Sequence, residues 1–316
     1  MLLEVSGETW NNYLISCNEN SLFANLSFLQ YTAACFNVKV SFYLWKEDNG
    51  AEILGFSVFS ADKAIKAPTN FHSFLVVERD APNEVKEDAF FQAIQILKRK
   101  FNSITLKLLP EFKYIDTYSK LGFEINDRYT YEKRLDNLFY SRNITRIVNN
   151  GAQKNYMVTI ACDFEKSFTS IWESNKRYFL TADKSRYFQF FFKLFWDGLV
   201  DVFDVYKNEI YVTSLLTIKD VKQQKVYTYL IGIPNKEMHL EAQTMLYRHC
   251  MSYYKTEGYL FCDMCGANLP NVAKYKAKFK GDLKLYRQVV YHSGFRVKLI
   301  NYVKKLFASS LLKIKN

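Results

Sequence analysis

One order of predicted elements occurs twice along the chain. In each half a β-hairpin is followed by a strand, a long helix, a strand, a short connection and a last strand, and the two copies are offset by roughly 155 residues. A mixed sheet with one strand–helix–strand crossover accommodates this order. The repeat therefore predicts an α/β protein with two similar domains, residues 1–140 and 141–294, and a C-terminal segment, residues 295–316.

The first half contains the clearest local signals. The dipeptide Asn49-Gly50 between two β-rich runs is typical of a hairpin turn. Asn83 is placed to cap a long helix whose apolar residues recur with helical spacing. Short helices are expected at Thr9–Cys17, Ser27–Phe36 and Tyr114–Leu121, the long helix at Glu84–Phe101, and strands at Val38–Trp45, Ala51–Ala61, Phe71–Glu78, Ser103–Leu109 and Ile125–Leu135.

The second half repeats these signals. Asp163 and Asn235 are expected to cap helices, and Lys207-Asn208 is expected to turn a hairpin. Helices are predicted at Ser141–Gly151, from Phe164, at Ser185–Trp196 and at Lys236–Lys255, and strands at Tyr156–Cys162, Val200–Tyr206, Glu209–Ile218, Lys225–Ile233, Tyr259–Met264 and Leu285–Tyr291, the last of which closes the second copy.

The net charge of +11 is confined to one end of the chain. From Asn271 to Asn316 there are twelve Lys and Arg but one acid, Asp282, so the preceding residues sum to zero. A localised basic zone indicates an anionic partner there: a phosphate-bearing substrate, RNA or a membrane surface. A soluble, lysine-rich C-terminus is the alternative.

The six cysteines lie mostly in apolar or mixed runs, which is typical of reduced, buried thiols in a cytosolic protein. Cys262 and Cys265 form a CxxC on or at the end of a predicted strand, and no second pair completes a zinc site. No metal is therefore predicted. The first residues lack the pattern of a signal peptide, and no window is apolar enough to span a membrane, so a cytoplasmic location is expected.

The stretch Gly258–Tyr291 is the candidate site. It begins as an apolar strand, passes through a Gly-Ala-Asn-Leu-Pro loop, becomes basic and aromatic in alternation, and ends in a second strand. Because the positive charge of the chain begins here, the stretch is predicted to hold an anionic substrate or donor.

The order of elements resembles the GNAT acyltransferase fold, here as a tandem pair. Within Gly258–Tyr291, the residues Gly258-Tyr-Leu-Phe-Cys-Asp263, Gly266, Asn271, Tyr275-Lys276 and Phe279-Lys280-Gly281 resemble the C-terminal signature of the FemABX family. Ser141-Arg-Asn-Ile-Thr-Arg146, followed by Gly151, is similar to the Arg-rich helix that begins the family's second domain. Lys280 departs from the pattern, because the family has glycine there, and Gln30–Asn37 lacks the basic residue that many members carry.

The resemblance implies a fold and an activity. The family transfers aminoacyl groups from aminoacyl-tRNA to the amine of a peptidoglycan precursor, and relatives with the same tandem fold acylate other amines. It implies a donor, aminoacyl-tRNA or acyl-CoA, with no tightly bound cofactor, and an anionic glycan or nucleotide-linked acceptor. It implies Lys276 and Tyr275 as the catalytic pair, in which Lys276 would steady the negative charge of the leaving group and Tyr275 supplies the aromatic ring beside it. Neither Arg79–Asn83 nor Pro234–Met238 has the Gly-rich pyrophosphate loop, which argues against ordinary acetyl-CoA chemistry.

Other candidate residues have two interpretations each. Tyr229 could dock the acyl carbonyl or be a packed core tyrosine, and Asp263, at a strand end, could be a general base or a structural acid. Lys276 could instead be one of several lysines along a solvated strand edge. The remaining candidates for binding substrate or donor are Arg146, Lys278 and Lys280.

Residues 295–316 combine apolar residues with six Lys and Arg and no acid, the pattern of a basic amphipathic helix. Such a helix suits an anionic membrane surface, or it could dock on the second domain with its lysines outward. Three functions remain: a transferase acting on a cell-envelope precursor near the inner membrane face and using tRNA or acyl-CoA, a binding protein whose donor sites are lost, and an RNA-binding protein that uses the basic zone.

Overall fold

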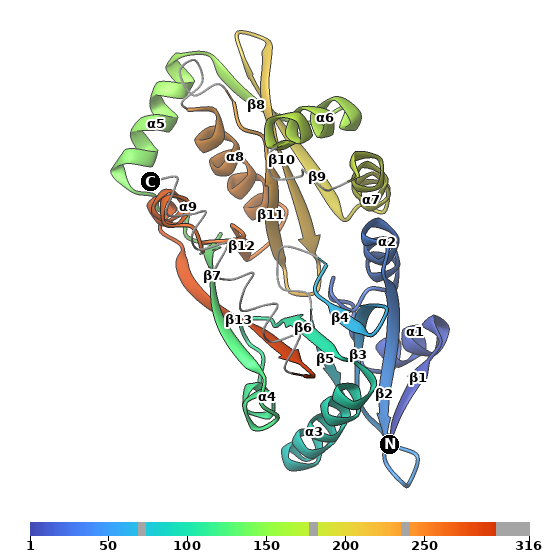
Figure 1. Ribbon diagram of the computed structural model, residues 1–316. Helices are drawn as coiled ribbons and strands as arrows, with labels where there is room; N and C mark the ends of the chain where they lie inside the picture. Colours follow the sequence, from blue (N-terminus) through green and yellow to red (C-terminus); the bar gives the residue numbers. More distant parts are fainter. Residues whose placement is uncertain (69–73, 177–182, 235–240, 295–316) are drawn as a thin grey trace. The chain divides into compact units, whose positions relative to one another are not determined.

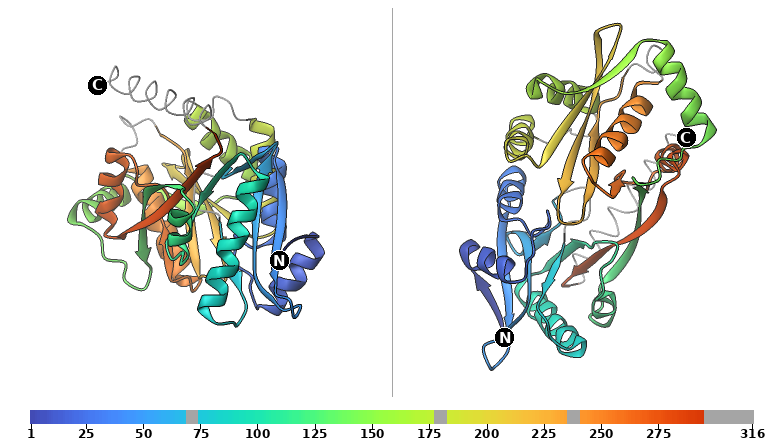
Figure 2. Two further views of the ribbon diagram at one scale, coloured as in Figure 1. Left: turned by 60° about the horizontal axis from the view of Figure 1, so that its bottom comes forward. Right: turned by 180° about the vertical axis from the view of Figure 1, so that it is seen from behind.

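The computed structural model describes residues 1–68, 74–176, 183–234 and 241–294. The chain forms two compact units (Figures 1 and 2). Of the described residues, unit 1 comprises those of Met1–Tyr13, Val38–Asp127 and 287–294, and unit 2 comprises those of Leu14–Asn37 and Arg128–Tyr286. Two strands, β7 (Glu124–Arg134) and β13 (Asp282–His292), contribute residues to both units.

Unit 1 is a mixed sheet with helices on both faces. Its strands are ordered β1-β2-β3-β4-β6-β13, and β5 pairs with β3. The strand bounds are β1 (Leu2–Val5), β2 (Lys39–Lys46), β3 (Glu52–Ala61), β4 (Ala64–Lys66), β5 (Val76–Glu78) and β6 (Ser103–Lys107), and the helices are α1 (Gly7–Ser16), α3 (Asn83–Lys100) and α4 (Ile115–Lys120). β4 runs parallel to β6, and the last residues of β13, Gln288–His292, run antiparallel to β6.

Alternation along β3 divides the core of unit 1 between the two faces. Leu54, Phe56 and Val58 lie in one buried cluster with the apolar side of α3. Gly55 points the other way, where a Cβ would come within 2.7 Å of the Leu44 side chain and 2.8 Å of Tyr13. The missing side chain therefore lets α1 pack closely on the sheet.

Unit 2 repeats the architecture. Its strands are ordered β7-β12-β11-β10-β9-β8, with β11 and β12 parallel. The strand bounds are β8 (Tyr156–Ile160), β9 (Val200–Lys207), β10 (Ile210–Asp220), β11 (Lys225–Ile231) and β12 (Phe261–Asp263), and the helices are α2 (Leu26–Phe36), α5 (Arg142–Gln153), α6 (Phe164–Asn175), α7 (Lys184–Trp196), α8 (Ala242–Thr256) and α9 (Pro270–Lys276), which continues into a 3₁₀ turn, Ala277–Phe279.

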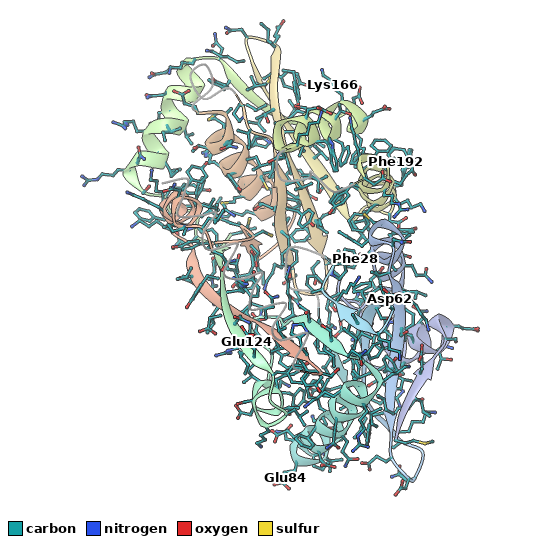
Figure 3. The ribbon with its side chains drawn as sticks, viewed as in Figure 1. Phe28, Asp62, Glu84, Glu124, Lys166 and Phe192 are labelled. Atoms are coloured by element: carbon teal, nitrogen blue, oxygen red, sulfur yellow. The ribbon has the colours of Figure 1, made fainter. Side chains whose placement is uncertain are left out.

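Helices cover both faces of the unit 2 sheet. α5 and α8 lie over one face and α6 and α7 over the other (Figure 1). Leu246 and Met251 of α8 are buried against β9, β10 and β11. On the opposite side the rings of Phe164 and Phe192 lie 5.7 Å apart between α6 and α7, where Figure 3 labels Phe192. The Phe-rich composition of α7 is therefore explained in part by packing.

Most predicted elements are present at or near their predicted bounds, and the α/β class with a mixed sheet in each half is confirmed. Asp163 caps α6 by accepting from the N–H of Lys166 at 3.0 Å. Asn83 does not cap α3, because it is the first helical residue and Pro82 precedes it at the N-cap. The predicted helix Lys236–Lys255 is seen from Ala242, since residues 235–240, including the expected cap Asn235, lie outside the described part of the chain.

Two differences concern the C-terminal region. The basic segment predicted as alternating residues on a strand edge is helix α9, with Pro270 at its first position, where the fixed φ of proline favours helix initiation. The last strand, β13, pairs through Gln288–His292 with β6 and lies between β6 and β7 in the strand order. The domain boundaries near residues 140 and 294 remain a prediction, since the compact units are a different division. The C-terminal segment, residues 295–316, is outside the described residues.

Candidate functional site

The parallel strands β11 and β12 of unit 2 part at their carboxyl ends. Their ladder runs from Lys225–Phe261 to Tyr227–Asp263 and stops there. Beyond this point β11 continues to Ile231 along β10. The chain that leaves β12 follows β7 instead: the N–H groups of Met264 and Ala267 donate to the carbonyls of Tyr131 and Tyr129, each at 2.8 Å. The carboxyl ends of parallel strands that separate in this way are a common position for ligands.

A β-bulge marks β11 at the same level. Leu216 of β10 pairs with Leu230 and Thr217 pairs with Thr228, so the register shifts at Tyr229. Tyr229 is half-buried, and its ring lies 5.5 Å from that of Phe191 on α7. Bulges are over-represented beside active sites because they bend a strand and redirect its backbone. The strand parting and the bulge together define the candidate site.

Asp263 closes β12 as a buried carboxylate. Its Oδ1 accepts from the Thr130 hydroxyl at 2.5 Å and from the Cys265 N–H at 2.7 Å. Burial raises the pKa of Asp263, although these hydrogen bonds and the nearby Lys225 and Lys276 act to lower it. Raised carboxyl pKa values are expected for proton-transfer groups and also for structural acids in apolar surroundings, so its role as a base remains a prediction.

Lys276 lies beside the end of β12. Its side chain is buried, and Nζ donates to the carbonyls of Met264, Cys265 and Gly266, the last at 3.0 Å. Burial lowers the pKa of Lys276. The lysine is therefore not on a solvated edge. The structure brings Asp263 and Lys276 to the same strand end.

Tyr275 points toward α8. Its hydroxyl lies 3.1 Å from the Thr244 hydroxyl, and its ring packs 5.5 Å from Phe279 and 6.1 Å from Tyr247. Burial raises the pKa of the Tyr275 phenol. These contacts attach α9 to α8, and the catalytic role that the resemblance implies for Tyr275 stays a prediction.

The three remaining basic candidates, Arg146, Lys278 and Lys280, lie in different surroundings. Arg146 is exposed on α5 and donates to Asn143 Oδ1 at 3.3 Å. Lys278 is half-buried, and its carbonyl accepts from the N–H of Ser141 at 3.1 Å, so the start of α5 adjoins the turn after α9. Lys280 is exposed with a φ of +59°, a left-handed conformation that favours glycine, as the resemblance predicts for this position. Binding of anionic groups by these side chains stays a prediction.

Sequence reasoning missed the polar groups around the strand parting. Thr130 and Thr228 contact Asp263, through its carboxylate and its carbonyl oxygen respectively. At the end of β11, Asn175 donates to the carbonyl of Ile231 at 2.8 Å and Gln243 to that of Gly232 at 2.9 Å. The sequence signal that could have indicated one of them is Thr228, which lies in an otherwise largely apolar predicted strand. The partners of these groups depend on the fold, because they are far apart in the sequence.

In unit 1 the strands that correspond to β11 and β12 also part, because β5 continues along β3 beyond Phe74. Phe74 forms a parallel bridge with Leu108, and its N–H donates to the carbonyl of Lys107 at 3.0 Å. The buried ring of Phe74 packs 5.8 Å from Phe56 and 5.9 Å from Phe112. The β-bulge at Tyr229 therefore distinguishes unit 2, since β5 pairs with β3 without a register shift.

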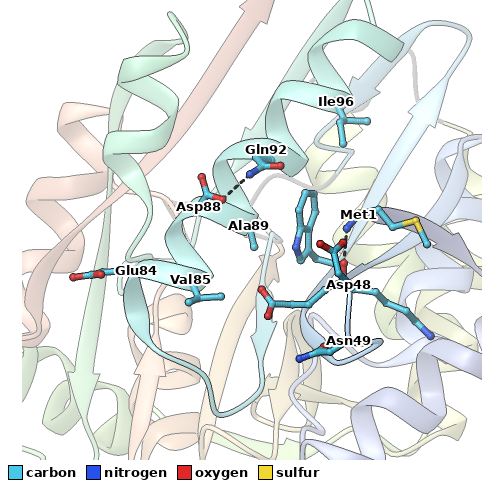
Figure 4. A pocket seen from close by; sticks show the side chains of 12 residues that line it. Met1, Asp48, Asn49, Glu84, Val85, Asp88, Ala89, Gln92 and Ile96 are labelled. Carbon is cyan, nitrogen blue, oxygen red and sulfur yellow. Dashed lines mark hydrogen bonds between the residues drawn. The ribbon is translucent and has the colours of Figure 1, made fainter.

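Unit 1 has a separate hollow of 950 Å³ between α3 and the turn from β2 to β3 (Figure 4). Carboxylates of Glu47, Asp48, Glu84 and Asp88 line it, and Gln92 donates to Asp88 at 2.6 Å. Within the described ranges, no group of three or more His, Cys, Asp or Glu side chains is arranged to hold a metal ion. No helix among the described residues is both long and apolar enough to cross a membrane.

Solved structures with the same fold cover most of the chain. FemX matches with a TM-score of 0.64 at 14% identity, over 91% of this chain and 96% of its own. A tandem GNAT protein from the clavulanic acid biosynthesis pathway matches with a TM-score of 0.59 at 10% identity, over 93% and 99%. L-PGS from Bacillus licheniformis matches with a TM-score of 0.57 at 11% identity, over 94% and 96%.

No protein-family model and no curated protein matches the sequence. At identities of 10 to 14%, the structural likeness establishes the fold. The chain therefore has the tandem GNAT fold, with its candidate site where β11 and β12 part in the second unit.

Proposed function

We propose that the protein is an N-acyltransferase that moves an acyl or aminoacyl group onto the amine of an anionic cell-envelope precursor. The observation that carries this proposal is the parting of β11 and β12 beside the bulge at Tyr229. The likeness to FemX and to L-PGS supports aminoacyl or acyl transfer in general, and three of the FemABX-like residues, Asp263, Gly266 and Lys276, lie at the carboxyl end of β12.

Acyl transfer to an amine depends mainly on positioning. The amine attacks the acyl carbonyl, the carbon–nitrogen bond forms as the bond to the donor's oxygen or sulfur breaks, and the amine proton passes to a base. A strand end with a bulged neighbour offers backbone dipoles to the carbonyl oxygen. Asp263 is the last residue of β12, at this opening, and we propose that it is the base.

The donor is aminoacyl-tRNA or acyl-CoA, and the acceptor is an anionic glycan or nucleotide-linked amine. The basic zone that begins at Asn271 supports an anionic partner. We place the protein in the cytoplasm at the inner membrane face, held through residues 295–316. Co-sedimentation of the full chain with anionic vesicles, but not with zwitterionic ones, checks this location, and equal recovery with both would argue against it.

The test is transfer of a radiolabel by the purified full chain. Aminoacyl-tRNAs and acyl-CoAs are screened against lipid- and nucleotide-linked amino sugars, with product formation as the readout. We expect turnover with one donor class. Absence of product with both classes, under conditions in which FemX is active, would contradict the proposal.

Asp263→Asn provides the matched site variant. Asparagine retains an oxygen that accepts from Thr130 and Cys265 but cannot take a proton, so kcat/KM should fall by about 100-fold. Asp282→Asn makes the same chemical change at an exposed position and should leave kcat/KM within about twofold of the wild type. Equal effects of the two substitutions would remove Asp263 from the mechanism.

A second candidate is a binding protein of the same fold without transferase activity. The engagement of Lys276 by three carbonyls favours it, because a leaving group would have to displace them. Binding of a nucleotide-linked precursor without turnover of either donor would support this candidate. A third, RNA binding through the basic zone, predicts affinity that falls steeply with salt, and a flat salt response would exclude it.

A further inference from the structure

Lys276 is a buried lysine whose hydrogen bonds are all directed into one loop. Lys276 is 7% exposed, and its Nζ donates hydrogen bonds to the carbonyls of Met264, Cys265 and Gly266. An ammonium group carries three N–H donors and no acceptor. Burying that charge is costly unless every donor is satisfied, and three carbonyls satisfy all of them.

The loop that receives these bonds has an unusual backbone. Cys265 and Gly266 have φ values of +49° and +61°, and the first of these is uncommon for a residue with a Cβ. Converging three consecutive carbonyls on one point also places their dipoles side by side, which is unfavourable without a cation between them. Lys276 supplies that cation from α9.

The position of this loop determines where β12 leads. Met264 and Ala267 are bonded to β7 through the carbonyls of Tyr131 and Tyr129, on the side away from β11. The Cys265 N–H is bonded to Asp263 Oδ1, so the same loop orients the carboxylate at the end of β12. A change in residues 264–266 would therefore alter both the strand parting and the orientation of Asp263.

We propose that Lys276 is a positioning residue: by gathering the carbonyls of residues 264–266, it keeps the end of β12 apart from β11 and so forms the opening that admits the acyl arm of the donor. The identity of the ligand, an acyl donor, rests on the proposed function. The role of Lys276 in the loop does not. It differs from stabilisation of the leaving group, because an ammonium whose three N–H groups are engaged has none to offer to that group.

The chain offers a matched control on the same helix. Lys274 is exposed on α9, and Lys276 is buried two residues later. Methionine at either position keeps a long, unbranched side chain and removes the ammonium. Lys276→Gln is a second variant, since its amide retains two of the N–H donors and should restore part of the loop's order.

The first arm of the test is amide hydrogen exchange of the full chain without donor. Lys276→Met should accelerate exchange at residues 264–267 by tenfold or more, Lys276→Gln by less, and Lys274→Met should leave these amides unchanged. Unchanged exchange at 264–267 in a folded Lys276→Met protein would overturn the proposal. If Lys276→Met does not fold, unchanged exchange in Lys276→Gln decides in the same way.

The second arm uses transfer kinetics. A positioning role predicts that Lys276→Gln raises KM for the donor more than it lowers kcat, with the pH profile of kcat unchanged. Loss confined to kcat, with normal exchange at 264–267, would instead indicate the leaving-group role and reject ours. If no donor gives turnover with the wild type, the proposed function fails, but the exchange arm still tests Lys276, so the two failures are distinguishable.

Discussion

At the scale of single residues, the close approach of the backbone at Gly232 to neighbouring side chains decides the structure at the end of β11. Gly232 follows this strand, and a Cβ built there would overlap the Thr213 hydroxyl and lie 3.3 Å from that of Ser174. The Gly232 N–H donates to the carbonyl of Ser214 at 2.9 Å, and its own carbonyl accepts from Gln243. Gly232 is therefore required by the backbone path that leads away from the candidate site.

Gly232→Ala should destabilise the protein by about 2 kcal/mol, because the added methyl forces Thr213 or the strand end to move. Urea unfolding measures the change. Gly151→Ala is the control: its Cβ meets the flexible end of the Met245 side chain at 2.8 Å, which can move aside, so the loss should be much smaller. The double variant Gly232→Ala/Thr213→Ala should recover part of the lost free energy of unfolding. Strictly additive effects of the two substitutions would show that the added methyl does not clash with Thr213.

The sequence predicted which residues lie at the candidate site where a motif contained them. It did not predict which groups surround those residues. Lys276 and Tyr275 were singled out by resemblance and Asp263 also by its place at a strand end. Asp263 and Lys276 lie at the end of β12, whereas Tyr275 packs toward α8. The three carbonyls that surround Lys276 could not be foreseen, because they require positive φ angles at Cys265 and Gly266 that no local pattern encodes. Thr130 was also missed, since its partner Asp263 is 133 positions away.

At the scale of elements, side-chain caps mark the starts of α2, α5, α6 and α7. The cap at Asp163 was readable because an acceptor side chain precedes an amphipathic run, whereas Ser141, predicted as the first helical residue, is the N-cap of α5. The cap predicted at Asn83 was wrong by one residue, since Pro82 takes that position and Asn83 enters the helix. Short strands such as β1 and β4 were missed because three or four residues give no periodicity, and their pairing comes from the rest of the sheet.

Asp163→Ala should lower the free energy of unfolding by about 1 kcal/mol, because the Lys166 N–H at the start of α6 loses its acceptor. Asp163→Asn keeps that acceptor and should retain most of the stability. Asn83→Ala should have little effect, because Asn83 makes no cap in α3. Thermal unfolding of the three variants checks the order, and an Asn83→Ala loss as large as that of Asp163→Ala would contradict it.

At the scale of the whole molecule, the repeat predicted the tandem architecture, and the two halves then diverged in detail. Unit 2 has a bulge at Tyr229 beside its parted strands, whereas β5 of unit 1 pairs with β3 in an unbroken register. Sequence patterns place β11 and β12 in order but do not say where a ladder ends, because pairing depends on residues far apart in the chain. The pairing of Gln288–His292 with β6 was hidden for the same reason.

We expect the parted strands of unit 2 to hold the acyl donor. Hydrogen exchange of the full chain, with and without a non-reactive analogue of aminoacyl-tRNA or acyl-CoA, tests it most directly. The donor should slow exchange at residues 226–233 and 263–268 and leave residues 74–78 and 104–108 of unit 1 unchanged. Protection confined to the unit 1 segments, with none at the ends of β11 and β12, would contradict the account.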